Sequence, residues 1–344
     1  MPENIVEGGE PRFAHLSNVH PEWEKVAARY KAVEQKMNEL YSLPIKEFRQ
    51  IPYRPPPIPA ASPVLGTDIN IREKEIVVRD GAKVGIRIYQ PAVLGKEHLL
   101  FFNVHGGGWT VGTPETEECQ NRLIAARNRA VVVSVDYRKA PEFPFPYALN
   151  DSLDALLWCQ KNADSLAINP QRIIVGGGSA GANICTVLTH LARDNNVAGI
   201  VGQILNIPVT CHPKHFPAEK YEYLSYTQNA DAPMVSAARM RQFWNNYLPG
   251  EEEDPRASPL LAASLAGLPP TLVQVAGMDP LRDEGLAYAE SLRASGVDVT
   301  LKIYPGMPHA FYAFPELEPS VRYLEAMVEW IDQLGGRVPG GTGE

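Results

Sequence analysis

Residues 172–183 of this 344-residue chain read RIIVGGGSAGAN. A β-strand pattern enters a run of small residues and leaves it as an amphipathic helix pattern, with apolar residues at positions 184, 187, 188 and 191. GxSxG between a strand and a helix is typical of a nucleophile elbow, whose glycines let the two elements approach closely. The serine is then held in a strained conformation, with its Oγ above the sheet at the positive end of the helix. The stretch therefore predicts a nucleophile at Ser179; the alternative is a glycine-rich turn without chemistry.

A second glycine run, HGGGW at residues 105–109, directly follows an apolar strand pattern. Three consecutive glycines free backbone N–H groups to face a substrate oxygen without obstruction by side chains. A phosphate-binding loop is the alternative, but no GKS/T or GxGxxG pattern accompanies this run. The predicted oxyanion hole consists of the backbone N–H groups of Gly107, Gly108 and Ala180. Two neighbours are predicted to support the loop, without acting as a base: His105 and Gly106.

A nucleophilic serine needs a base and an acid that orients it, and in this arrangement the order along the chain is serine, acid, histidine. Asp279 follows the strand pattern at residues 271–275 and is the predicted acid, whereas Asp283, one helical turn later, is predicted to support the loop. His309 lies in a run bounded by proline and glycine after the last strand pattern, and it is the only histidine that follows Asp279. It is the predicted base. No histidine or cysteine cluster with metal-ligand spacing occurs, so we expect neither a metal nor a cofactor.

Short β-rich runs alternate with helical patterns along most of the chain. The predicted strands are residues 75–79, 84–90, 99–104, 130–135, 172–175, 200–207, 271–275 and 299–303. The predicted helices include residues 115–127, 151–162, 180–194 and 280–295. Because the middle strands are nearly continuous in apolar residues, both faces of their sheet must be covered. The predicted fold class is α/β, a mostly parallel eight-stranded sheet with helices on both faces and a helical cap, and ligands should bind beyond the carboxyl ends of the strands.

Two segments depart from this alternation. An amphipathic stripe that starts at Trp23 predicts a helix beginning after Pro21, and residues 51–63 contain six prolines, which indicate an extended connector. Residues 210–256 are rich in aromatic residues and interrupt the strand–helix pattern. The predicted organisation is residues 1–65 as cap helices and connector, 66–209 with 257–334 as the α/β core, 210–256 as the second cap segment, and 335–344 as a flexible tail.

Charge and cysteine content restrict the partners and the compartment. The formal net charge of −8 argues against a nucleic-acid partner, which favours a basic surface. No apolar run approaches the roughly 20 residues that span a bilayer. The four cysteines, at positions 119, 159, 185 and 211, form no CxxC pair and are expected to be free thiols. Since the N-terminal residues also show no signal-peptide pattern, the expected location is the cytoplasm.

Together these motifs resemble the hormone-sensitive-lipase-like branch of the α/β-hydrolases, a branch that includes many bacterial esterases. The resemblance covers roughly residues 99–330 and rests on HGGGW, VDYRKAPE (135–142), GGGSAG (176–181), DPLRDEG (279–285) and PHAF (308–311). It implies a serine carboxylesterase that hydrolyses small to medium carboxylic esters, a cap built from the two segments named above, and a possible homodimer through the sheet edge. The chain departs from the family pattern at Gly178, where Asp is frequent, and at Ala182, where Gly is frequent.

Three chemical outcomes remain open from sequence. The first is ester hydrolysis through an acyl-enzyme on Ser179, with His309 as base and Asp279 holding its tautomer. The second uses the same three residues in an acyltransferase, lactonase or amidase, because the triad does not determine the acceptor or the bond. The third is a ligand-binding receptor of the same fold without catalysis, such as the gibberellin receptors. Such receptors characteristically lack the histidine, which is present here.

Overall fold

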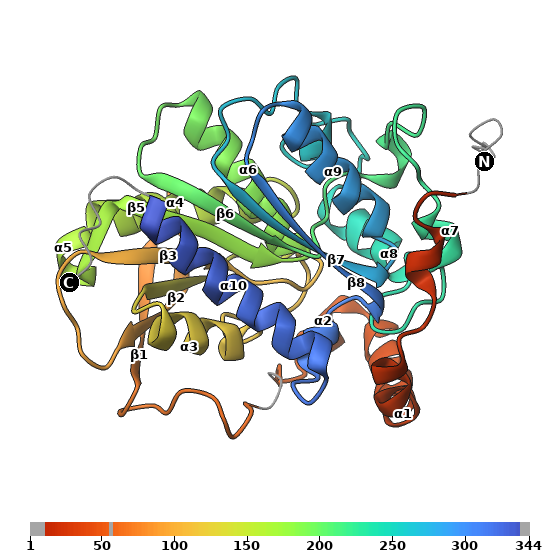
Figure 1. Cartoon of the computed structure of the whole chain (residues 1–344), viewed down its shortest axis with the longest axis horizontal. Coiled ribbons are helices and arrows are strands. Elements are labelled where there is room, and N and C mark those ends of the chain that lie inside the picture. The colour runs from red at the N-terminus through yellow and green to blue at the C-terminus, as the bar shows by residue number, and fades with distance from the viewer. Residues whose placement is uncertain (1–10, 55–57, 338–344) are drawn as a thin grey trace.

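A computed structural model describes residues 11–54 and 58–337 of the chain. Within these residues one sheet of eight strands has the order β1-β2-β4-β3-β5-β6-β7-β8 (Figure 1). The pairs β1–β2 and β2–β4 are antiparallel, and every other pair is parallel. The strands are β1 (Ile69–Val77), β2 (Lys83–Pro91), β3 (His98–Val104), β4 (Val131–Asp136), β5 (Ile168–Gly178), β6 (Ile200–Asn206), β7 (Thr271–Met278) and β8 (Val299–Pro308). The predicted fold class, including the mostly parallel sheet, is confirmed.

Alternating side chains of the central strands feed two separate apolar cores. Leu100 and Phe102 of β3 point into one core, which also holds residues of α4 (Tyr147–Lys161), α6 (Ala180–Asp194) and α9 (Arg282–Ala294). Leu99 and Phe101 point into the other, which holds residues of α3 (Glu118–Arg127) and α10 (Glu318–Arg337). Figure 1 shows α3 and α10 side by side across one face of the sheet. Burial on both faces explains why these strands read as continuous apolar runs.

The sequence predicts each strand, but several strand ends differ from the prediction. β1 begins at Ile69, whereas the prediction starts at residue 75, because its charged residues lie on the exposed edge of the sheet and hide the β pattern. β5, β7 and β8 each run three to five residues further than the predicted range. The glycines that precede Ser179 and the Pro–Gly run that precedes His309, predicted as turn and loop, are therefore strand residues.

The observed bounds of the helices agree with the predicted bounds more closely than those of the strands do. The prediction for residues 180–194 matches α6, and α9 differs from its predicted range by two residues at its start and one at its end. α3 begins at Glu118, three residues later than predicted, because residues 114–117 form a turn. α4 begins at Tyr147, four residues earlier than predicted. α10 extends through Arg337, so the first three residues of the predicted flexible tail are helical, and the rest of that tail lies outside the described residues.

The two segments outside the alternation contact each other. α1 (Pro21–Tyr41) starts where the stripe predicts, and the rest of the N-terminal segment contains η1 (Ala14–Ser17) and α2 (Ile45–Phe48). The segment after β6 contains η2 (Pro213–His215), α7 (Ser225–Gln228) and α8 (Ala237–Tyr247). Arg239 of α8 donates to Asn38 Oδ1 at 3.1 Å, and the Tyr41 and Phe243 rings meet edge to face. Figure 1 places α1, α7 and α8 on one side of the molecule.

The apolar stripe of α1 is only partly buried. Trp23, Val26 and Tyr30 are buried in the core that also holds α3 and α10, whereas Val33 is 53% exposed. The N-terminal half of α1 therefore packs on the domain, and its C-terminal half reaches α8. No helix among residues 11–54 and 58–337 is long and apolar enough to cross a membrane.

Candidate active site

Ser179 stands between β5 and α6 in a strained backbone conformation, with φ of 55° and ψ of −118°. Such a φ is costly for a residue with a Cβ and persists only where the surroundings enforce it. Its N–H donates to the Asn206 carbonyl at 2.8 Å, which fixes the turn to β6. A Cβ at Gly177 or Gly181 would overlap the Val104 carbonyl oxygen, so the close approach of β5, α6 and β3 requires glycine at both positions. The tight strand–turn–helix geometry expected from GxSxG, with a strained serine at the turn, is thus present.

The predicted acid and base meet at the same edge of the sheet. Asp279 directly follows β7 and His309 directly follows β8, as Ser179 follows β5. His309 Nδ1 and Asp279 Oδ2 are 2.7 Å apart, and the two residues are only 3% and 1% exposed. Because the carboxylate pairs with Nδ1, the assigned tautomer carries its proton there and leaves Nε2 as the basic nitrogen. The second oxygen, Asp279 Oδ1, accepts from Leu281 N–H at 2.9 Å, which holds the carboxylate in place.

The glycine loop after β3 has a backbone that only glycine adopts easily. Gly107 and Gly108 have φ of 121° and 56°. A Cβ at Gly107 would overlap the Val111 carbonyl, and one at Gly108 would overlap the Phe243 ring of α8. The loop therefore lies between its own following turn and the segment after β6. Ala180, the third predicted oxyanion residue, is the first residue of α6, where N–H groups have no partner within the helix.

His105 is a neutral, buried ring beneath this loop. Burial lowers its pKa to about 3, and its ring stacks on Tyr137 with centroids 4.4 Å apart. Its Nδ1 lies 2.7 Å from the Gly106 carbonyl oxygen, while Tyr137 Oη donates to the His105 carbonyl at 3.0 Å. A group with so low a pKa is not protonated in the neutral range. These contacts fit the predicted supporting role and not that of a base.

Asp283 contacts the segment after β6 and not the His309 ring. Its Oδ2 accepts from the N–H groups of Leu224 and Ser225 at 2.7 and 2.8 Å, and its Oδ1 accepts from Arg282 Nε at 2.7 Å. The Arg282 and Asp283 side chains are completely buried. The neighbouring Glu284 accepts from Thr210 N–H at 2.7 Å, and burial raises its pKa well above its ordinary value. The start of α9 thus anchors the 210–256 segment through side chains.

Glu117 is a buried residue of this region that the sequence patterns do not indicate. Its Oε1 accepts from Gly106 N–H at 3.1 Å, and its Oε2 accepts from Gln120 Nε2 at 3.3 Å. It is 4% exposed, and burial, opposed by hydrogen bonds from backbone and side-chain groups, raises its pKa to about 7. Its sequence context, the acid-rich run TEE, reads as a solvated helix start, so only the tertiary structure brings it to the glycine loop.

The raised pKa of Glu117 predicts a pH-dependent stability. In the unfolded chain this carboxyl ionises near its ordinary pKa of 4.5, whereas the folded protein holds the proton up to about pH 7. The contribution of Glu117 to the free energy of unfolding is therefore complete below pH 4.5 and is lost as pH rises through 7. Between pH 6 and 8, the loss is on the order of 1 kcal/mol.

Urea unfolding of the wild type and of Glu117→Gln at pH 6 and pH 8 measures this loss. Both values lie above the pI of about 5.6, at which the net charge vanishes. From pH 6 to pH 8 the free energy of unfolding of the wild type should fall relative to that of Glu117→Gln, so the variant gains relative stability. Parallel pH dependence in the two proteins would contradict an elevated pKa for Glu117.

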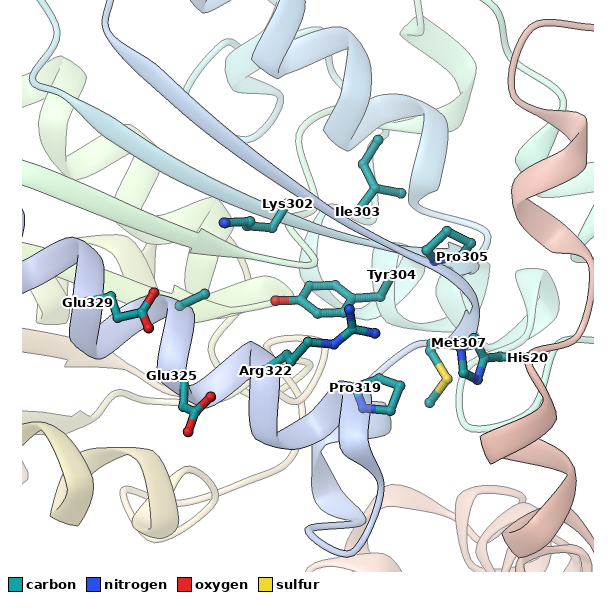
Figure 2. Close-up of a pocket in the computed structure, with 11 residues that line it drawn as sticks. His20, Lys302, Ile303, Tyr304, Pro305, Met307, Pro319, Arg322, Glu325 and Glu329 are labelled. Atoms are coloured by element: carbon teal, nitrogen blue, oxygen red, sulfur yellow. The ribbon is translucent and has the colours of Figure 1, made fainter.

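A surface pocket of about 390 Å³ lies apart from these residues. Figure 2 shows it between β8 and α10, with Lys302 on the strand and Arg322, Glu325 and Glu329 on the helix. None of Ser179, Asp279 and His309 lines it. The candidate site itself is closely covered, since Ser179 is only 7% exposed. In the described part of the chain no group of three or more His, Cys, Asp or Glu residues is arranged to hold a metal ion.

Comparison with known proteins places the chain in a family. Residues 101–313 match the model of a family described as having the alpha/beta hydrolase fold, and the chain belongs to that family. The resemblance inferred from the sequence motifs is thereby confirmed.

Individual relatives cover most of the chain. It is 38% identical to the carboxylesterase NlhH of Mycobacterium tuberculosis over 75% of this chain and 80% of that protein. It is 33% identical to an ethyl acetate hydrolase of Pseudomonas putida over 76% and 82%. Among solved structures, vibralactone cyclase matches with a TM-score of 0.80 and 30% identity, over 94% of this chain and 97% of that one. An esterase of Pyrobaculum calidifontis matches with a TM-score of 0.75 and 30% identity, over 92% and 98%.

Proposed function

We propose that this chain is a serine carboxylesterase that hydrolyses small to medium carboxylic esters through an acyl-enzyme on Ser179. The observation that carries the proposal is the buried 2.7 Å pair of His309 Nδ1 and Asp279 Oδ2, which lies at the same edge of the sheet as a strained serine. The relatives described as carboxylesterase and ethyl acetate hydrolase support the choice of ester hydrolysis.

The first half of the proposed reaction acylates the enzyme. Ser179 Oγ attacks the ester carbonyl carbon while His309 Nε2 takes the hydroxyl proton. Asp279 stabilises the imidazolium that forms, because it already accepts from Nδ1. The negative charge that develops on the carbonyl oxygen is met by the N–H groups of Gly107, Gly108 and Ala180. Collapse of this intermediate breaks the bond to the alcohol, which leaves with the proton from His309 Nε2.

The second half regenerates the enzyme. Water gives a proton to His309 Nε2 as its oxygen attacks the acyl carbon, and the same N–H groups stabilise the second oxyanion. The carboxylic acid departs when Ser179 Oγ recovers its proton from the imidazolium. Neither half needs a metal or an organic cofactor, and each proton that leaves Ser179 or water passes through one ring nitrogen.

The proposal includes a cap over this chemistry. Residues 1–65 and 210–256 would form it around the core of 66–209 and 257–334, and the contacts between α1 and α8 support the joining of its two parts. Phe243 of α8 packs against Gly108, whose N–H is a proposed oxyanion donor. The four cysteines are unpaired, which fits the proposed cytoplasmic location. A homodimer through an edge of the sheet is the proposed assembly.

A panel of p-nitrophenyl esters with increasing acyl length tests the proposed reaction. We expect turnover of the short and medium esters, with one carboxylic acid formed for each nitrophenol released. Adding an alcohol should leave the acid as the main product, because water is the proposed acceptor. Predominant formation of the new ester would instead assign the triad to acyl transfer.

A further inference from the structure

The carboxylate of Glu117 lies between the two loops that the proposed mechanism requires to stay together. Its Oε1 accepts from the N–H of Gly106, which precedes the two oxyanion glycines. The same oxygen is 2.7 Å from the position that a Cβ on Gly178 would take, directly before Ser179. The backbone N–H of Gly178 is among the hydrogen-bonding groups that lower the pKa of this carboxyl. One side chain thus contacts both the glycine loop and the nucleophile elbow.

The two loops also touch each other at this point. A Cβ on Gly106 would lie 2.9 Å from the Gly178 carbonyl oxygen and 3.6 Å from Glu117 Oε1. Neither glycine has a positive φ, so both lack a side chain for reasons of space and not of backbone conformation. At Gly178 the space is taken by Glu117 Oε1 and by Tyr312 Oη, which is 2.9 Å from the same Cβ position.

A buried polar network fixes the Glu117 carboxylate from behind. Gln120 Nε2 donates to Glu117 Oε2 at 3.3 Å and to Asn103 Oδ1 at 3.2 Å. Asn103 Nδ2 in turn donates to Ser134 Oγ at 3.1 Å. All four residues are buried, and they connect the carboxylate to adjacent positions of β3 and β4. The carboxylate is therefore held relative to the sheet and not only to the two loops.

The adjacent residue provides an internal comparison. Glu118 is also buried, but its carboxylate accepts from Arg87, Arg122 and Tyr89. These partners include two cations, and none of them belongs to the glycine loop or to the elbow. Among residues 11–54 and 58–337, the hydrogen-bond donors to Glu117 are backbone N–H and amide groups and include no cation. A buried carboxylate without a cation is costly, which argues for a role other than stability.

We propose that Glu117 is a positioning residue for the ester hydrolysis proposed above, fixing the backbones of Gly106 and Gly178 so that the oxyanion N–H groups and Ser179 Oγ keep their relative places. This role rests on the proposed function, since it acts through Gly107, Gly108 and Ser179. Glu117 does not touch the reacting atoms. It acts on the transition state by holding donors whose misplacement by about 1 Å costs on the order of 10² in rate.

Four variants test the role by steady-state kinetics on a short p-nitrophenyl ester. Glu117→Ala removes the acceptor and should lower kcat by roughly 10- to 100-fold with KM changed by less than about threefold, because the donors act mainly in the transition state. Glu117→Gln retains an oxygen that can accept from Gly106 N–H and should recover most of kcat. Gly178→Ala pushes the carboxylate out of its place and should reproduce the loss. The double variant Glu117→Ala/Gly178→Ala should be no slower than the single variants.

Glu118→Gln is the matched control, because it alters the neighbouring buried carboxylate and leaves the two loops untouched. It should lower the melting temperature with little change in kcat. Two results would overturn the positioning role. One is that the losses in kcat of Glu117→Ala and Gly178→Ala multiply in the double variant. The other is that kcat for Glu117→Ala stays within about twofold of the wild-type value. If Glu117→Ala does not fold, Gly178→Ala decides alone: a tenfold loss supports the role and an unchanged kcat refutes it. Wild-type turnover of the ester is measured in parallel, so failure of the proposed function is recognised separately.

Discussion

Replacing Ser179 by alanine is expected to lower kcat for a short p-nitrophenyl ester by about 10⁶-fold while the protein stays folded. The hydroxyl is the proposed nucleophile, and alanine has no oxygen that could attack the ester carbonyl. Alanine keeps the Cβ and the strained φ of 55°, so the turn between β5 and α6 has the same backbone to accommodate. Initial rates with a high concentration of the variant measure the loss of kcat. The far-ultraviolet circular dichroism spectrum and the melting temperature show whether the variant stays folded.

The contrast with other hydroxyl residues controls for a general effect of the substitution. Ser165 is exposed and lies in α5 (Ala163–Leu166), which precedes β5, whereas Ser179 follows the other end of that strand; Ser165→Ala should leave the rate unchanged. A Ser179→Ala protein that hydrolyses the ester at an undiminished rate would exclude Ser179 as the nucleophile.

Asp279→Asn is expected to lower kcat by about 10⁴-fold. The carboxylate accepts from His309 Nδ1 at 2.7 Å, and an amide that presents its NH₂ group to the ring would favour the tautomer with its proton on Nε2. That nitrogen could then no longer take the serine proton. An amide oxygen in the same place would hold the ring but would not stabilise the imidazolium. Steady-state kinetics at fixed pH measure the loss.

Asp283→Asn separates this effect from a simple loss of a buried carboxylate. Asp283 accepts from two N–H groups of the 210–256 segment and from Arg282. Asp283→Asn should therefore lower the melting temperature with little change in kcat. An Asp279→Asn variant that loses less than tenfold in kcat would contradict the assignment of Asp279 as the orienting acid.

The parts of the fold that were predictable are those with a local signal. The glycines around Ser179 indicate the close approach of β5 and α6, and the predicted helix at residues 180–194 is the observed one. Alternation of apolar runs and helical stripes was enough to predict each strand of the sheet. The β1 edge was predicted poorly because an exposed edge strand carries charged residues and lacks an apolar run.

In the candidate site, too, some features have a local sequence signal and others depend on the tertiary structure. The pairing of Asp279 with His309 could be predicted because each directly follows a strand and their proposed order along the chain is restricted. Glu117 could not, since a carboxylate in an acid-rich helix start has the pattern of a solvated residue. Only the packing of the turn that precedes α3 against β3 and β5 brings it to Gly106 and Gly178. The anchoring of the 210–256 segment by Asp283 and Glu284 likewise could not be predicted from the sequence, because it depends on backbone N–H groups far along the chain.

Covalent labelling tests the central claim most directly. The wild type, incubated with a labelled fluorophosphonate and digested, is analysed by mass spectrometry for the site of the adduct. The proposed function predicts about one label for each chain, attached to Ser179, and loss of ester hydrolysis in proportion to labelling. An active enzyme without an adduct, or with its adduct on another residue, would contradict Ser179 as the nucleophile.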